Sequence, residues 1–103
     1  MYRGKVLLVE DDLVGPQSIR PLVLQYIQVP CHIDVRNASQ LLAGDYPTEE
    51  NYLCIVLDLR LPNKTGSDVF EFLRARDQRV PILRATHNTE RFKNDLRGIA
   101  RRD

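Results

Sequence analysis

Two short apolar runs that each end abruptly at acidic side chains constrain the fold of this chain more than any other feature. The first run, Lys5–Val9, stops at the acidic trio Glu10–Asp12, and the second, Leu53–Leu57, stops at Asp58. Neither run alternates apolar with polar residues. Each is therefore predicted to be a strand covered on both faces, as in a parallel sheet.

Segments with helical periodicity separate these runs. If Ser18 is the N-cap of the first helix, Pro21 lies in the first turn, where no intrahelical donor is lost, whereas a helix that starts earlier would bend at Pro21. A short helix is expected over Ala38–Leu42, ended by Gly44. Two further apolar stripes have helical spacing, Val69, Phe70, Phe72 and Leu73, and later Phe92, Leu96, Ile99 and Ala100.

Two weaker strand patterns complete the alternation of strands and helices. Ile33–Val35 is expected to be a short, more exposed strand, and Val80–Leu83 a short apolar one. Alternating strands and helices predict an α/β domain with a mainly parallel sheet and right-handed crossovers. The 103 residues suffice for one domain, residues 1–103.

Charge and composition exclude several classes of protein. The formal net charge is +1, so we expect no bulk attraction to nucleic acid or membrane, and the basic tail from Arg91 onward is expected to be a solvated helix face. No apolar run approaches the roughly 18 residues of a membrane span, and the N-terminal residues show no signal-peptide cleavage site. Cys31 and Cys54 lack a metal-type spacing, so we expect reduced thiols in or near the core of a cytoplasmic protein.

The acidic residues at the strand ends are the candidate chemistry of the chain. Ligands of such folds bind beyond the carboxyl ends of the strands, where Glu10, Asp11 and Asp58 are expected to converge. Clustered carboxylates repel one another, and Mg²⁺ relieves that repulsion while keeping positions open for phosphate oxygens. An aspartate can be the nucleophile of phosphoryl transfer, and Thr86 could bond a phosphoryl oxygen. The alternative, that these acids only cap helices or face solvent, is favoured for Asp12 alone.

Three segments in order resemble the response-regulator receiver domain of two-component signalling. They are Val6–Asp12, Ile55–Pro62 with Gly66, and Pro81–Thr86, and the resemblance covers about residues 4 to 97. It implies a flavodoxin-like, doubly wound parallel sheet, expected here to have four strands in the order 2-1-3-4 with helices on both faces, truncated after the fourth helix.

The resemblance also implies a role for each matching residue. Asp58 would be the phosphoacceptor, and Asp11 and Asp58 would bind Mg²⁺ through their carboxylates. Arg60 would contribute its backbone carbonyl to the metal, and Glu10 would act through a metal-bound water. Thr86 would be the switch hydroxyl, while the loop containing Pro62 and Gly66 would cover the site. The implied partner is a sensor histidine kinase or a phosphotransfer protein.

The chain departs from the family after the fourth helix. Receivers continue into a fifth strand, which ends in a lysine that pairs with the phosphoryl group, and a fifth helix; Asn94–Asp103 has no run that could form that strand. Lys93 lies too early and on the helical pattern, so it is not expected at the site. The fourth strand is then expected to be a sheet edge open to pairing, for example in a homodimer.

Two alternatives to a phosphoacceptor remain. A degenerate receiver could act as a phosphorylation-independent interaction or dimerisation module. A small aspartate-nucleophile phosphatase is disfavoured, because Arg60 stands where its second aspartate would be. His32 is expected to be a partly exposed structural residue at a strand start, and His87, beside Thr86, could modulate access of water to the site.

Overall fold

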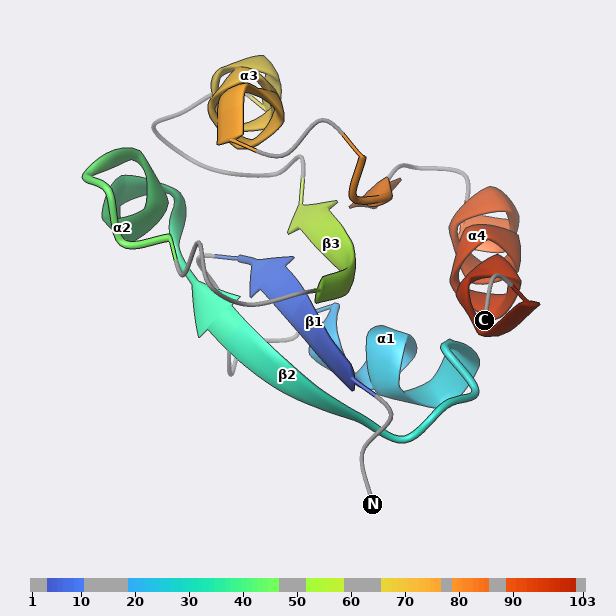
Figure 1. Ribbon diagram of the computed structural model, residues 1–103. Coiled ribbons are helices and arrows are strands. Elements are labelled where there is room, and N and C mark those ends of the chain that lie inside the picture. The colour runs from blue at the N-terminus through green and yellow to red at the C-terminus, as the bar shows by residue number, and fades with distance from the viewer. Residues whose placement is uncertain are drawn as a thin grey trace.

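The computed structural model describes residues 4–10, 19–46, 52–58, 66–76, 79–85 and 89–101. Four strands alternate with four helices along these segments, as Figure 1 shows. The strands are β1 (Gly4–Val9), β2 (Cys31–Arg36), β3 (Tyr52–Asp58) and β4 (Ile82–Ala85), and the helices are α1 (Arg20–Tyr26), α2 (Ala38–Leu42), α3 (Gly66–Arg76) and α4 (Thr89–Arg101).

The strands form one sheet in the order β2-β1-β3-β4, with every neighbouring pair parallel. The predicted flavodoxin-like order, 2-1-3-4, is therefore confirmed. The two central strands are the two apolar runs of the sequence, and Val6–Val9 and Cys54–Leu57 are each 0% exposed. A strand buried on both faces needs no polar alternation, which is why these runs are continuous.

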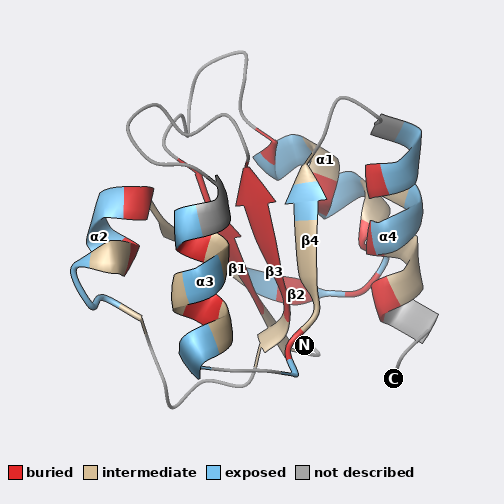
Figure 2. Cartoon of the chain, turned by 90° about the horizontal axis from the view of Figure 1, so that it is seen from above, coloured by how far each residue is buried: buried red, intermediate tan, exposed pale blue. Residues whose placement is uncertain are grey.

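The helices cover both faces of the sheet, in the pairs visible in Figure 2: α2 and α3 on the left, α1 and α4 on the right. On the α1/α4 face, Val23 of α1 and Phe92 and Leu96 of α4 pack against alternate residues of β1 and β3. On the α2/α3 face, Leu41 and Leu73 pack against the intervening residues. Each central strand thus contributes to two cores, because successive side chains point to opposite faces.

One predicted boundary was wrong by two residues, and one open alternative has an answer. Of the two starts considered for α1, the structure has the later one: the N-cap is Ile19, one residue after Ser18, and Pro21 lies in the first turn. The fourth strand spans Ile82–Ala85 instead of Val80–Leu83. Pro81 lacks an N–H for the ladder, so regular pairing begins after it, while Val80 is buried against the α2/α3 face without being in the strand.

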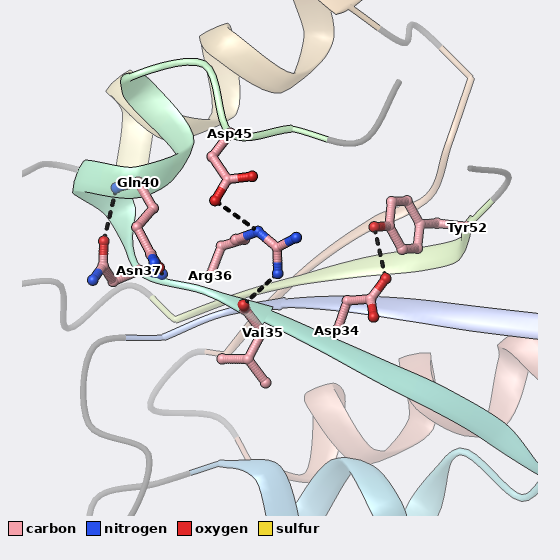
Figure 3. Close-up of polar contacts among 7 residues, drawn as sticks. All are labelled: Asp34, Val35, Arg36, Asn37, Gln40, Asp45 and Tyr52. Atoms are coloured by element: carbon pink, nitrogen blue, oxygen red, sulfur yellow. Dashed lines mark hydrogen bonds and ion pairs between the residues drawn. The ribbon is translucent and has the colours of Figure 1, made fainter. Parts of the chain in front are cut away.

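The other elements agree with the sequence patterns. The helix Ala38–Leu42 has the predicted bounds, and Gly44 follows it with a positive φ of 103°. Its N-terminus carries a capping box between Asn37 and Gln40, with two hydrogen bonds of 2.8 and 2.9 Å (Figure 3). Both cysteines are buried free thiols, as expected.

Strand β2 is longer than predicted and is partly exposed, as an edge strand should be. His32, Asp34 and Arg36 alternate along it. Asp34 accepts a hydrogen bond from the Tyr52 hydroxyl of β3 (3.0 Å), and Arg36 Nε lies 3.2 Å from an Asp45 carboxylate oxygen (Figure 3). The other carboxylate oxygen of Asp34 lies 3.2 Å from His32 Nε2. The exposed His32 at the strand start therefore has the structural surroundings that were expected.

The pairing of β1 with β3 contains one irregularity near its beginning. Lys5 pairs with Tyr52 but Val6 pairs with Cys54, so Leu53 is an extra residue on β3. The Leu53 side chain fills the space beside Gly4: a Cβ on Gly4 would lie 2.8 Å from Leu53 Cγ. Glycine at this position is what lets the extra leucine reach over β1.

Within the described segments, no helix has the length and apolar character that crossing a bilayer requires.

Candidate functional site

Glu10 and Asp58 lie at the same level on neighbouring strands, at the carboxyl edge of the sheet. Val9 pairs with Leu57, and Glu10 and Asp58 each follow by one residue. Asp58 is the last residue of β3 and is 4% exposed, and Glu10, which directly follows β1, is 1% exposed. They are the buried charged side chains of the described residues. The predicted convergence of these two carboxylates at one edge is consistent with this register.

The position of Glu10 is fixed by the backbone on two sides. Its own N–H donates to the Arg36 carbonyl of β2 (3.0 Å), and its Oε1 accepts a hydrogen bond from the Ile19 N–H (2.8 Å). Ile19 is the N-cap of α1 and has no side-chain cap, so the Glu10 carboxylate satisfies a backbone donor at the start of this helix. A charged hydrogen bond of this kind offsets part of the cost of burying the carboxylate.

Asp58 is aligned with the end of the fourth strand as well. It pairs with Ala85, the last residue of β4. The position that follows Ala85 is Thr86, the predicted switch hydroxyl. Thr86 and His87 lie outside the described residues, as do Asp11, Asp12, Arg60 and Pro62, so their predicted roles stay predictions.

The described carboxylates fit a hard divalent cation in the chemistry of their donor atoms. Two buried carboxylates at adjacent strand ends repel each other, and Mg²⁺ prefers oxygen ligands of this kind. Glu10 already has Oε1 engaged by a backbone donor. Among the residues that the structure describes, no three His, Cys, Asp or Glu side chains form a metal-binding group, and Asp11 is not one of those residues.

Lys93, which the sequence pattern did not assign to the site, contacts Glu90 and Tyr26. Its Nζ is 3.4 Å from Glu90 Oε1 and 4.9 Å from the centre of the Tyr26 ring. The hydrogen bond with Glu90 raises the pKa of Lys93, with Tyr26 adding a smaller contribution.

Two features escaped the sequence patterns. The bond from Ile19 to Glu10 spans nine residues, and no local signature marks it. The second feature is a cation–π cluster in which the guanidinium carbons of Arg84 and Arg74 lie 4.4 and 5.4 Å from the centre of the Phe70 ring. Arg84 was the available signal, since it is the charged residue within the apolar run of β4.

Comparisons with known proteins agree with this architecture. Transcription factor SKN7 of Candida albicans is 33% identical over 91 residues, which cover 88% of this chain. The match spans 15% of that protein's own length. No protein-family model matches the chain.

Two solved structures share the fold. A transiently phosphorylated "switch" of bacterial signal transduction superposes with a TM-score of 0.56 at 23% identity, covering 86% of this chain and 68% of the other. The bacteriophytochrome response regulator AtBRR gives a TM-score of 0.57 at 22% identity, covering 90% of this chain and 76% of that one. At such identities the likeness establishes the fold.

Proposed function

Because this chain is a domain of the response-regulator receiver type, we propose that it accepts a phosphoryl group from a histidine kinase or phosphotransfer protein onto Asp58. It would act as a single cytoplasmic signalling module that catalyses at most its own phosphorylation and dephosphorylation. The observation that carries the proposal is the burial of Asp58, at 4% exposure, level with Glu10 at the carboxyl edge of the sheet.

For phosphoryl transfer to Asp58, the main contribution of the protein is to position the carboxylate. An Asp58 carboxylate oxygen attacks phosphorus, a P–O bond forms, and the P–N bond to the donor imidazole breaks, so the imidazole leaves and takes up a proton. Leu57 and Val56, both 0% exposed, hold the end of β3 rigidly, so the carboxylate needs little reorganisation before the attack.

Mg²⁺ is the proposed cofactor, held by Asp58 and Asp11, with Glu10 acting through a water and Arg60 through its carbonyl. When bound, it would neutralise the charge on the phosphoryl oxygens. Glu10 would then have two tasks, because the same carboxylate that faces the proposed ion also holds the start of α1. Thr86 would donate a hydrogen bond to the phosphoryl group.

Incubation with acetyl phosphate and Mg²⁺, followed by intact-mass measurement, tests this proposal. Wild type should gain the mass of one phosphoryl group, and Asp58→Asn should gain none. Asp68→Asn, which changes an exposed aspartate in the first turn of α3, is the matched control and should be phosphorylated like wild type. An unmodified wild-type protein that is folded by circular dichroism would sink the proposal.

A second candidate is a phosphorylation-independent interaction module, with a partner or a second copy bound at the sheet edge. The position of β4 at one end of the sheet that the described strands form favours it, together with the contacts of Lys93 with Glu90 and Tyr26. This candidate predicts binding that does not change with Mg²⁺ or a phosphodonor. Light scattering that finds a monomer at high protein concentration would exclude the homodimer.

A further inference from the structure

The outer side of β4 presents backbone hydrogen-bonding groups. The Pro81 carbonyl accepts a hydrogen bond from the Ile55 N–H of β3 (2.8 Å). Since the N–H and C=O of successive strand residues point to opposite sides, those of Leu83 face β3 and those of Ile82 and Arg84 face away from it. In the described sheet no strand pairs with β4 on that side.

The topology argues against filling this edge with a strand that continues from α4. Helix α3 lies on the α2/α3 face and connects β3 to β4 by a right-handed crossover. Helix α4 packs on the opposite face, beside α1, and runs back along β4 in Figure 2. A parallel strand reached through α4 and placed outside β4 would require a left-handed crossover, which parallel sheets avoid almost completely.

The α2/α3 face beside this edge is basic and aromatic. Arg84, on β4, is exposed, and its guanidinium carbon lies 4.4 Å from the centre of the half-buried Phe70 ring. Arg74 approaches the same ring at 5.4 Å, and its Nη1 donates to the Val80 carbonyl (2.7 Å), which holds it in place just before β4. Two guanidinium groups are thereby fixed around one ring, next to the outward-facing backbone.

Like charge makes a second copy of this chain a poor occupant of the edge. Two copies of β4 could pair antiparallel through the outward-facing N–H and C=O groups of Ile82 and Arg84. In that register Leu83 of one copy would lie opposite Leu83 of the other. The two Arg84 side chains would then be diagonal neighbours on one face, roughly 7–8 Å apart, each with its own Arg74 nearby. Opposite charges across two strands attract, whereas like charges repel.

We propose that the outer edge of β4 binds an extended acidic segment of a partner protein, which adds to the sheet as a further strand with its carboxylates beside Arg84 and Arg74. The main-chain bonds would come from Ile82 and Arg84, and charge complementarity would select the partner. Leu83 and Ala85, half-buried on the other face, would receive the apolar side chains of that strand.

Fluorescence anisotropy with a labelled peptide of about eight residues, alternating valine and glutamate, tests the proposal. The full chain, without Mg²⁺ or phosphodonor, should bind this peptide and should bind a valine–lysine peptide at least about tenfold more weakly. A valine–glutamate peptide with methylated backbone nitrogens should not bind, because it cannot pair with a strand edge. The amide resonances of Ile82 and Arg84 should shift on binding.

Charge reversal at Arg84 tests the role of charge, and charge reversal at Arg91 is the matched control. Arg84→Glu should weaken binding of the glutamate peptide about tenfold and strengthen binding of the lysine peptide, and Arg84→Gln should give an intermediate loss. Arg91→Glu, on the exposed side of α4, should change neither. Equal binding of the two peptides, or glutamate-peptide binding that is unchanged in folded Arg84→Glu protein, would overturn the proposal. A dimer in light scattering that resists salt would overturn it in favour of self-pairing.

Discussion

Strands β3 and β4 are neighbours in one parallel sheet, yet they meet very different surroundings. Cys54–Leu57 of β3 are 0% exposed and covered on both faces, and Ile55–Leu57 are paired with both β1 and β4. None of the four residues of β4 is buried, and the contrast is visible in Figure 2, where β3 is red and β4 tan and pale blue. The difference separates two roles: β3 holds a carboxylate in a fixed place, and the outer edge of β4 is the surface to which we propose that a partner strand binds.

Truncating one leucine in each strand is the strongest test of this difference in packing between β3 and β4. Leu57→Ala should lower the free energy of unfolding by about 2–5 kcal/mol, because it opens a cavity in a fully buried site. Leu83→Ala, at a half-buried position, should cost about 1 kcal/mol. Urea denaturation followed by circular dichroism measures both. Equal losses would mean that β4 is as tightly packed as β3.

The carboxylate at the end of β1 should matter for stability as well as for the proposed chemistry. Glu10→Ala should cost about 1–3 kcal/mol, because the Ile19 N–H loses its buried acceptor. Glu10→Gln keeps an oxygen acceptor and should cost less. Hydrogen exchange at the Ile19 amide reports the effect directly: exchange should be faster in Glu10→Ala than in Glu10→Gln, and equal rates would contradict the assigned bond.

The buried thiol of β3 should make stability depend on alkaline pH. Burial raises the pKa of Cys54 from 9.0 to about 12, with a smaller contribution from Cys31. The folded state therefore holds this proton more tightly than the unfolded state. The stabilisation is fully present below pH 9 and is lost as pH rises toward 12, by about 1.4 kcal/mol per pH unit. Since other groups also titrate there, wild type should be compared with Cys54→Val, whose unfolding free energy should fall less steeply.

The smallest effect is expected at the exposed edge. Arg84→Gln should change the free energy of unfolding by less than about 0.5 kcal/mol, since an exposed cation over a ring contributes little. Thermal denaturation of wild type and variant in parallel measures it. A loss above about 1 kcal/mol would assign Arg84 a structural task and weaken its proposed role in partner selection.

The sequence predicted the sheet well because its strongest signals were local. Continuous apolar runs that end in Glu10 and Asp58 predict both the central strands and the edge at which the carboxylates gather. The sequence left the start of α1 open between Ser18 and an earlier residue. The Glu10 carboxylate bonds the Ile19 N–H at that start, and periodicity does not reveal such a distant contact. The predicted bounds of β4 were two residues too early. Val80 is apolar because it is buried, although it is not in the strand, and Pro81 lacks the N–H that pairing with β3 requires.

The extra residue at the start of β3 sets the phase of the whole strand. In a regular strand Tyr52 and Cys54 would point to the same face, but Tyr52 packs on the α2/α3 face and Cys54 on the opposite one. Leu53, accommodated by Gly4, makes this possible. Removing Leu53 would force a choice between the bond from Tyr52 to Asp34 and the present orientation of Asp58. The two ends of β3 are therefore coupled: the extra residue Leu53 at its start determines the face toward which the Asp58 carboxylate at its end points.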